Sequence, residues 1–440
     1  MTGVANEAES ITGKALNALR KYPLCDRCLG RLFARLGYGW SNRERGEALK
    51  RLIVMELHRR MLEGDDTART VFLELAPRLY PYSQGLYEKL TGKELGPEAC
   101  IICGGTLDDF IRKAAENGAA LLKAHDISRF VVGVRLSGGI DRLEDEIKAA
   151  VRAEHGESIK SEIRREVGKL IQSIGTGLTV DFDDPEATLL IEYPTGMLWL
   201  QVNSIFYKGR YWKKGRLISQ AYWPTPTGPK YYSIEEALWG LLSLHKAERL
   251  VLHASGREDV DARMLGTGRP MIIELKSPRV RRVPVEAVVR AANKNKALVE
   301  VEIEGSASRR EVRLYKEGVA RTTKTYKALI VSRSPLSDSI IRRIEDFFSE
   351  RTIMQRTPKR VLHRRPDILR RRKVYTIKCK RISNYTMECV IVAEGGLYIK
   401  ELVSGDEGRT TPSMSEITGS RMECVELDVI GVKHEAEITA

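Results

Sequence analysis

The chain has 440 residues, enough for two or three domains, and its 73 Lys and Arg residues outnumber its 59 Asp and Glu residues. A surface this basic attracts polyanions, so nucleic acid and acidic membrane surfaces are the partner classes to weigh. No apolar run approaches the roughly 20 residues that a spanning helix needs, and residues 1–14 lack the apolar core of a signal peptide. We therefore expect a cytoplasmic protein with no membrane partner.

The N-terminal part of the chain is predicted to be helical and to hold a metal. Within residues 8–62, apolar side chains recur at helical spacing. Four of the seven cysteines form two Cys-x-x-Cys pairs, Cys25 with Cys28 and Cys100 with Cys103. Because each pair presents two thiolates, the pairs together predict one structural zinc site, with a helical insertion bringing them close. A redox pair, which would need only one such motif, and unrelated buried cysteines are the alternatives.

The remaining elements predict an α+β fold. Strands and helices alternate through residues 127–225, which is typical of an α/β RNA-binding module, and Pro and Gly interrupt the chain at residues 222–232. Strands then dominate, residues 386–403 among them, with one helix at residues 337–350, so we expect a large, mainly antiparallel sheet. The three expected domains are an N-terminal zinc-binding region (1–106), an RNA-binding domain (107–229) and a catalytic domain (230–440).

A short charged segment follows the strand predicted at residues 249–255. In "SGREDVDARML", Arg257, Glu258, Asp259 and Asp261 stand close together. Such a cluster is common on a solvated turn, but it also suits a catalytic carboxylate presented at the end of a buried strand. In an extended segment Arg257, Asp259 and Asp261 share one face, so periodicity does not choose between the two aspartates.

The sequence lacks motifs for several other chemistries. The Gly-x-Gly of Gly266 and Gly268 is not followed by a predicted helix, and neither a dinucleotide fingerprint nor a P-loop appears. The seven histidines are scattered, with no Ser or Cys nucleophile motif beside them. We therefore expect any chemistry to be carried by side chains such as the carboxylates, without an organic cofactor.

Two stretches concentrate positive charge. They are residues 206–216, where aromatic rings are interleaved with the bases, and residues 359–373. A solvated face is the ordinary explanation, but in so basic a chain a track for an RNA phosphate backbone is equally supported. The candidate RNA contacts are Lys208, Arg210, Lys213, Lys214, Arg364, Arg365, Arg370, Arg371 and Arg372.

Several strings resemble one enzyme family. "GRED" after an apolar strand is similar to the Gly-Arg-x-Asp motif of pseudouridine synthases, and "ASGREDVDARMLGTGRPMIIEL" resembles the archaeal and eukaryotic tRNA pseudouridine synthases of the Pus-ten type. "TTKTYKALIV" resembles the family's Lys-x-Tyr strand, and "EGGLYIKELVSGDEGRTTPSM" resembles its Gly-x-Tyr-Ile-basic segment. "LCDRCLGRLFARLGYG" resembles the N-terminal zinc motif, and strings between residues 132 and 220 resemble a THUMP-type RNA-binding region.

The resemblance implies a tRNA pseudouridine synthase that acts on uridines of the TΨC arm (positions 54 and 55), without an organic cofactor. It implies that Asp259 is the nucleophile and that Lys400 is its ion-pair partner. It also implies that Tyr326 stacks on the target base and that Arg257 fills the space the base leaves. The THUMP-like and zinc-binding regions would hold the folded RNA by shape and phosphate contacts.

Asp261 has no counterpart in this pattern, since some other pseudouridine synthase families have glycine after the aspartate motif. Two ordinary roles for its carboxylate are a hydrogen-bond acceptor in a turn and an ion pair with Arg263 or Arg269.

Two other functions are compatible with part of the sequence. Another THUMP-bearing tRNA modifier, a methyltransferase or thiouridine synthase, would need a nucleotide-binding loop and an α/β domain after residue 230. A non-catalytic, zinc-containing tRNA-binding or RNA-folding protein would share the basic surface and the zinc. It would give no reason for Asp259, Tyr326 and Lys400 to occur together in family context. We expect the partner to be tRNA and the protein to be a monomer.

Overall fold

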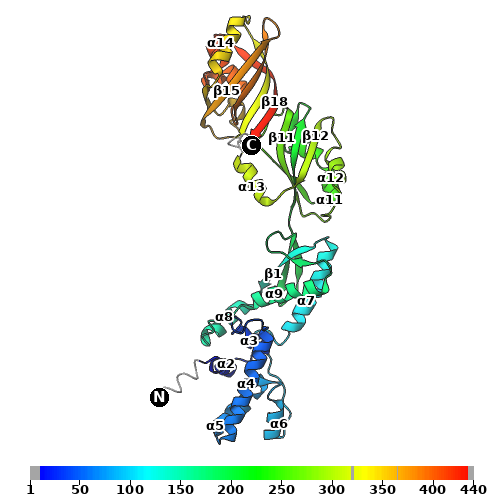
Figure 1. The fold of residues 1–440 in the computed structure, drawn as a ribbon, viewed down its shortest axis with the longest axis vertical. Helices are drawn as coiled ribbons and strands as arrows, with labels where there is room; N and C mark the ends of the chain where they lie inside the picture. The colour runs from blue at the N-terminus through cyan, green and yellow to red at the C-terminus, as the bar shows by residue number, and fades with distance from the viewer. Residues whose placement is uncertain (1–9, 319–321, 364, 435–440) are drawn as a thin grey trace. The chain divides into compact units, whose positions relative to one another are not determined.

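The structure is a computed structural model that describes residues 10–318, 322–363 and 365–434. It divides after Val202 into two compact units (Figure 1). The sequence placed this boundary near residue 230. The division falls earlier because residues 205–213 form a strand that pairs on both sides with strands of the second unit. No helix in the described ranges is long and apolar enough to cross a membrane.

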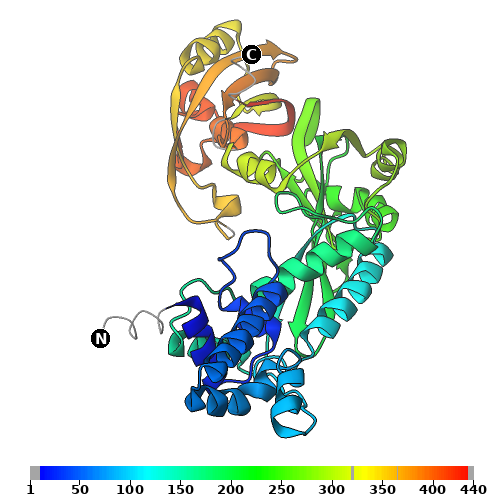
Figure 2. The same cartoon turned by 60° about the horizontal axis from the view of Figure 1, so that its bottom comes forward.

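Helices make up the N-terminal part of the first unit, as the sequence predicts (Figure 1, Figure 2). They are α2 (Ile11–Lys21), α3 (Asp26–Arg31), α4 (Asn42–Leu62), α5 (Asp66–Leu75), α6 (Gln84–Thr91) and α7 (Leu107–Ala124). α3 and α4 cross closely because each has a glycine at the contact. A Cβ on Gly30 would lie 1.8 Å from the Asn42 carbonyl oxygen, and one on Gly46 would lie 1.9 Å from that of Asp26. A larger residue at either position would force the two helices apart.

The rest of the first unit is a small sheet covered by helices. Its strands run in the order β2-β1-β3-β4, with β1 parallel to β2 and β3 and with β4 antiparallel. Alternate residues of β1 and β3 are buried, and α7 and α9 pack against one face of the sheet. The alternation of strands and helices predicted for this region is therefore present. The elements are β1 (Arg129–Leu136), α8 (Ile140–Ala150), α9 (Ile159–Ile174), β2 (Thr179–Val180), β3 (Ala187–Tyr193) and β4 (Leu198–Val202).

The second unit is built on one large, mainly antiparallel sheet, as predicted. Its strand order is β12-β5-β11-β18-β13-β16-β15-β14-β17, with β10 paired to β11. β11 and β18 run parallel where Arg263 lies opposite Asp428. The strands are β5 (Ile205–Lys213), β10 (Arg249–Ala254), β11 (Arg263–Lys276), β12 (Val299–Ser306), β13 (Thr322–Ser332), β14 (Thr352–Arg356), β15 (Leu369–Arg381), β16 (Thr386–Glu394), β17 (Thr410–Thr411) and β18 (Met422–His434).

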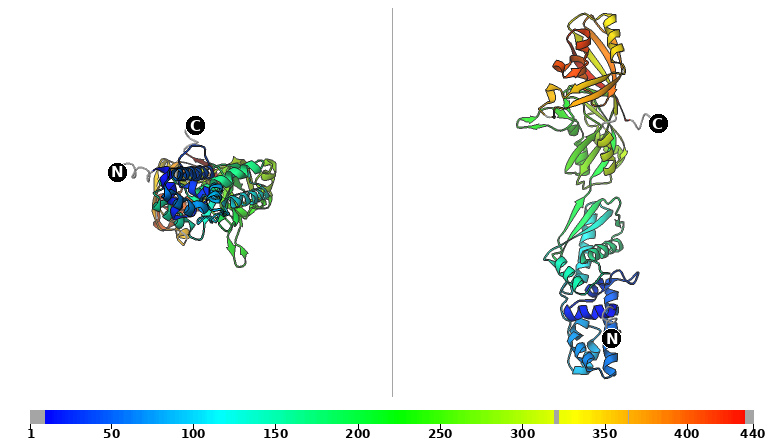
Figure 3. Two further views of the ribbon diagram at one scale, coloured as in Figure 1. Left: turned by 90° about the horizontal axis from the view of Figure 1, so that it is seen from below. Right: turned by 90° about the vertical axis from the view of Figure 1, so that its left-hand side faces the viewer.

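Short helices border this sheet, and a hairpin projects from it (Figure 3). The hairpin, β7 (Pro224–Thr225) and β8 (Gly228–Pro229), is the Pro- and Gly-rich break in the sequence. The helices are α10 (Ile234–Ala237), α11 (Gly240–His245), α12 (Val285–Ala292), α13 (Arg309–Gly318), α14 (Asp338–Phe348), α15 (Ile399–Ser404) and α16 (Met414–Thr418).

The strand expected over residues 386–403 ends early. β16 stops at Glu394, and the chain then turns through Gly395 and Gly396, the second of which has φ of 93°. A Cβ on Gly395 would lie 2.3 Å from the Thr322 hydroxyl oxygen, so this turn presses against β13. Residues 399–404 form α15 instead of continuing the strand.

A buried ion cluster connects three helices of the first unit. The Arg31 guanidinium, 1% exposed, donates from Nε to Glu144 at 2.6 Å and from Nη1 to Glu162 at 2.8 Å. Arg31 lies on α3, Glu144 on α8 and Glu162 on α9. Arg27 also contacts Glu162, at 3.1 Å, and Lys148 contacts Glu144, at 3.3 Å. Arg31 therefore links the helical part of this unit to the helices that flank its sheet.

Arg31→Met should lower the free energy of unfolding of the first unit. Removing one partner of a buried pair leaves the other charge uncompensated, at a cost of about 3–5 kcal/mol. We expect a loss near the lower end of that range because Arg27 and Lys148 remain. Urea unfolding followed by circular dichroism measures it. Arg59→Met, which breaks exposed ion pairs on α4, is the matched control and should change stability little. Equal stability losses in the two variants would contradict this role for Arg31.

Candidate functional site

The charged segment after β10 is anchored in the interior of the second unit by a buried ion pair. Glu258 points inward, where Arg269 Nε donates to its carboxylate at 2.8 Å and the Tyr211 hydroxyl donates at 3.0 Å. Burial opposes ionisation of Glu258, but the charges of Arg269 and Lys213 outweigh it, so the pKa of this carboxyl is lowered. Glu258 is thus a structural residue, and its neighbour Asp259 faces the other way.

Lys213 does not serve as the RNA contact that the sequence predicted. Its side chain is 1% exposed, and Nζ donates to the backbone carbonyls of Asp259 at 2.9 Å and Ile218 at 3.0 Å. A buried ammonium cannot reach an RNA phosphate. The prediction was wrong because it placed β5 in the RNA-binding domain. β5 belongs to the sheet of the second unit, and the Lys213 side chain is buried there. Lys213 instead fixes the backbone of the aspartate segment.

Asp259 is paired with an arginine that the sequence did not single out. Arg360 Nη1 and Nη2 bind its two carboxylate oxygens at 3.0 and 2.9 Å, and Arg360 Nε binds Glu401 at 2.7 Å. Arg360 lies in a short 3₁₀ helix, η3 (Lys359–Val361), inside the basic run. Burial opposes the charge of Arg360, but Glu401 and Asp259 outweigh it and raise its pKa.

Lys400, predicted as the partner of Asp259, contacts Asp261 instead. Lys400 Nζ lies 2.5 Å from Asp261 Oδ2. The chain turns at Val260 and Asp261, where the Ala262 N–H donates to the Asp259 carbonyl at 3.1 Å. An extended segment would have placed both aspartates on one face, but this turn separates them. Burial opposes ionisation of Asp261, yet the hydrogen bond and charge of Lys400 outweigh it and lower the pKa of Asp261.

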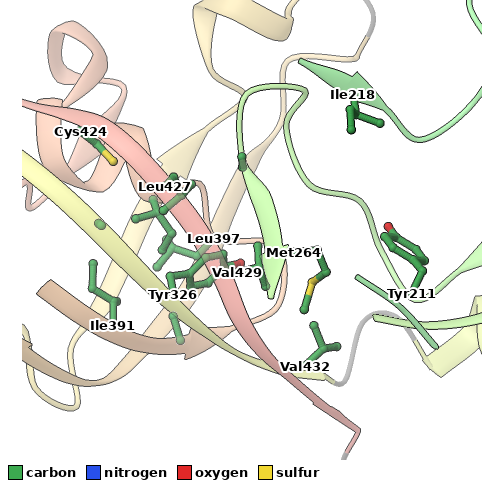
Figure 4. Close-up of a cluster of buried hydrophobic side chains, with 14 of the residues drawn as sticks. Tyr211, Ile218, Met264, Tyr326, Ile391, Leu397, Cys424, Leu427, Val429 and Val432 are labelled. Carbon is green, nitrogen blue, oxygen red and sulfur yellow. The ribbon is translucent and has the colours of Figure 1, made fainter. Parts of the chain in front are cut away.

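These residues border a cavity of about 1020 Å³ in the second unit. All four predicted active-site residues line it: Arg257, Asp259, Tyr326 and Lys400. Tyr326 is 7% exposed and lies opposite Val429 within a buried apolar cluster (Figure 4). Burial raises the pKa of Tyr326 to about 12, so its phenol stays protonated near neutral pH. Arg257 is exposed.

The other predicted RNA contacts divide between the cavity and the surface. Arg365, Arg370 and Arg372 line the cavity, whereas Arg371, between two of them on β15, is exposed. Successive strand residues point to opposite faces, which explains the division. Arg364 lies outside the described residues. The remaining three are each ion-paired near the sheet edge: Lys208 with Glu311, Arg210 with Glu304, and Lys214 with Glu300.

The four paired cysteines meet in the first unit, as predicted. The Sγ atoms of Cys25, Cys28, Cys100 and Cys103 all lie within 4.8 Å of one another. Cys103 Sγ is 3.5 Å from that of Cys25 and 3.6 Å from that of Cys28. Tetrahedral zinc with Zn–S bonds near 2.3 Å separates its sulfurs by about 3.8 Å, so this donor set fits the ion. The two knuckles are joined by the Ile101 N–H, which donates to the Pro23 carbonyl at 2.9 Å.

Known proteins resemble the chain along nearly its whole length. A family model described as "Pus10, C-terminal" matches residues 206–433, and one described as "Pus10 THUMP domain, archaeal" matches residues 114–192. A relative from Aeropyrum pernix, named tRNA pseudouridine synthase Pus10, is 58% identical over 96% of this chain and 97% of its own. A relative of that name from Ignisphaera aggregans is 42% identical over 97% of this chain and 99% of its own.

Among solved structures, a chain titled "Crystal Structure of a Cbf5-Nop10-Gar1 Complex" is 17% identical, with a TM-score of 0.30 over 51% of this chain and 47% of that one. A likeness this weak carries no argument. The family matches and the full-length relatives do. The chain belongs to the Pus10 family of tRNA pseudouridine synthases and is a pseudouridine-forming isomerase.

Proposed function

We propose that this enzyme isomerises uridine to pseudouridine in the TΨC arm of tRNA, at positions 54 and 55, with Asp259 as the nucleophile. The observation that carries the proposal is the place of the Asp259 carboxylate. It borders a cavity of about 1020 Å³ together with the buried ring of Tyr326. A carboxylate and an aromatic face in one large cavity suit a base that has left its stack. The positions within tRNA rest on the family resemblance alone.

The chemistry proposed for Asp259 follows from its surroundings. Isomerisation breaks the C1′–N1 bond, turns the uracil and joins C1′ to C5, so no group enters or leaves and no organic cofactor is required. An ionised carboxylate can attack the sugar or the base as a nucleophile. Arg360 orients the carboxylate through two parallel hydrogen bonds to its two oxygens. Arg360 must yield one of these bonds when the carboxylate attacks.

The remaining cavity residues receive positioning roles. Tyr326 supplies a neutral, buried ring against which the uracil stacks. Arg257, exposed at the same cavity, occupies the space that the base leaves in the RNA, since extrusion costs a few kcal/mol that such a contact offsets. Lys400 and Glu401 are neighbours on α15. Lys400 holds the aspartate segment through Asp261, and Glu401 holds Arg360 through the guanidinium Nε. The role we propose for Lys400 is therefore that of a positioning residue, and the ion-pair partner of Asp259 is Arg360.

We further propose that Cys25, Cys28, Cys100 and Cys103 hold one structural zinc ion in the first unit. Four thiolates complete a tetrahedral shell and leave no open position for a substrate, which is the pattern of structural zinc. The ion would hold the two Cys-x-x-Cys knuckles together across the helices that separate them.

Asp259→Asn should abolish isomerisation and leave tRNA binding nearly intact. The amide keeps the shape of the side chain but loses its nucleophilicity, so the single-turnover rate should fall by about 10³-fold or more. Tritium release from tRNA labelled with [5-³H]uridine measures the reaction, and filter binding measures affinity.

Asp261→Asn is the matched control two residues away. It weakens a half-exposed ion pair with Lys400, and such pairs contribute about 1 kcal/mol or less, so the rate should fall by no more than about tenfold. Full activity of Asp259→Asn, or abolition of activity by Asp261→Asn alone, would overturn the assignment of the nucleophile.

Purified protein should contain one Zn²⁺ per chain, and Cys100→Ser should lower both this stoichiometry and the thermal stability of the first unit. The loss follows because zinc binding contributes directly to folding. Metal analysis by mass spectrometry tests it on protein prepared without chelators. Cys424→Ser, which removes a thiol of the second unit, should leave the metal content unchanged. Protein without zinc would contradict the site.

The basic run should divide into surface and cavity arginines. Arg371→Ala should weaken tRNA binding and flatten its salt dependence by about 0.7–0.9 in log–log slope, because one phosphate contact is lost. Its rate at saturating tRNA should not change. Arg370→Ala, on the cavity side of the same strand, should lower that rate as well. An unchanged salt slope for Arg371→Ala would show that its side chain is only solvated.

A further inference from the structure

Lys324 is a buried lysine at the cavity to which no role has been given. It lies on β13 two residues before Tyr326, so the two side chains share one face of the sheet. Lys324 is 7% exposed and lines the cavity. Its neighbours across the sheet are apolar, Ala393 on β16 and Val432 on β18.

The charges around this amine are unusual for a lysine. In the described part of the chain no hydrogen bond or ion pair reaches Lys324 Nζ. A Cβ on Gly256 would lie 2.8 Å from Nζ and 3.1 Å from Arg269 Nη1, so the amine and the guanidinium border the same glycine. Glu258, the carboxylate whose charge acts on this amine, is already bound by Arg269 and by the Tyr211 hydroxyl.

This environment favours the neutral amine. Burial and, to a smaller extent, the charge of Arg269 lower the pKa of Lys324 to about 7, and Glu258 opposes the shift. A neutral amine carries a lone pair and accepts a proton. A base whose pKa lies near the working pH is the most effective proton acceptor.

The proposed isomerisation includes a proton transfer that is separate from the attack by Asp259. When C5 displaces the Asp259 carboxylate from C1′, C5 still carries its hydrogen, and N1 is doubly bonded to C6. The C5–H bond must then break, its electron pair must form the C5–C6 double bond, and N1 must gain a proton. A group beside the base has to accept the proton from C5.

The other groups that line the cavity are poor acceptors for this proton. Arginines do not deprotonate in proteins. Tyr326 keeps its proton because its pKa is about 12. Glu258 is bound by Arg269, Asp261 by Lys400 and Asp259 by Arg360. The Tyr398 hydroxyl accepts a hydrogen bond from Arg365 Nη1. Of the two lysines that line the cavity, Lys324 is the one that no carboxylate binds in the described part of the chain.

We propose that the Lys324 amine accepts the proton that leaves C5 of the target uracil. The ammonium so formed returns a proton to N1, directly or through water, so no oxidant, reductant or further group is needed. This role rests on the proposed isomerisation and adds a second catalytic residue to Asp259.

The test is Lys324→Met, which keeps the length of the side chain and removes the lone pair, in the full-length protein on tRNA transcript. The single-turnover rate should fall by about 10²–10⁴-fold, the usual contribution of general base catalysis, while tRNA affinity is kept. Transcript made with [5-²H]uridine should then react more slowly than the protiated one, by a larger ratio than in wild type, because loss of the C5 proton has become rate-limiting.

Two further readouts separate this role from a structural one. The wild-type rate should drop by about tenfold per pH unit below pH 7, as the amine becomes protonated, and this limb should vanish in Lys324→Met. Lys327→Met, on the opposite face of the same strand and ion-paired with Glu388, should keep the wild-type rate and pH profile.

Folding can be checked without activity. Because the pKa of Lys324 is lower in the folded protein than the ordinary value near 10.4, the unfolded chain binds more protons between about pH 7 and 10. Wild-type stability should therefore gain a contribution that increases with pH across this window, and Lys324→Met should lack it. Identical pH dependence of urea unfolding in the two proteins would overturn the proposal.

The outcomes also separate this proposal from the function beneath it. A wild-type protein that forms no pseudouridine in tRNA would refute the proposed function itself. An active wild type with an equally active Lys324→Met would refute only the role of Lys324. So would a slower variant whose deuterium effect equals that of wild type.

Discussion

The buried pair between Glu258 and Arg269 is the interaction on which the rest of this site depends. Glu258 is anchored inside the second unit by Arg269 and Tyr211, and Lys213 binds the next carbonyl, that of Asp259. With one residue of the segment fixed inward, the next must face the cavity. Removing one partner of such a pair leaves a desolvated charge, so the anchor is costly to break. The same Arg269 charge contributes to keeping Lys324 neutral. One ion pair therefore fixes the aspartate segment and also adds to the burial that lowers the pKa of Lys324.

A second network of ion pairs connects α15 to the aspartate segment. α15 presents Lys400 to Asp261 and Glu401 to Arg360, and Arg360 in turn grips Asp259. Asp259 is thus held at two points, through its backbone carbonyl by Lys213 and through its carboxylate by Arg360. Such double support holds a side chain in a productive geometry better than a single contact, because each bond restricts a different rotation. It also explains why the turn at Gly395 and Gly396 matters, since it sets where α15 begins.

Sequence patterns predicted the elements well where a local rule governs them and poorly where long-range pairing does. The Cys-x-x-Cys spacing located the thiolate cluster, and alternating apolar residues located most strands of the large sheet. The place of β5 was missed because its partners, β11 and β12, lie far along the chain. The resemblance predicted Asp259 and Tyr326 as active-site residues, and both line one cavity. It did not predict the turn at Val260 or the pairing of Arg360 with Asp259. A run of basic residues has the same sequence pattern whether its side chains face solvent or a carboxylate. Lys213 shows the converse, a basic residue counted as surface that lies inside.

The positive charge of this chain therefore has two distinct uses. Exposed bases such as Arg371 act at long range on a polyanion, and salt screens them. Bases that line the cavity act at short range in a region of lower dielectric, where each charge changes the protonation of its neighbours. Arg360 binds the Asp259 carboxylate, whereas Arg269 adds to the burial that lowers the pKa of Lys324. Positive charge therefore has opposite effects on the two partners, because it attracts a carboxylate and disfavours a second cation. This arrangement depends on Arg269 being the ion-pair partner of Glu258. If Glu258 paired with Lys324 instead, its charge would favour the protonated amine.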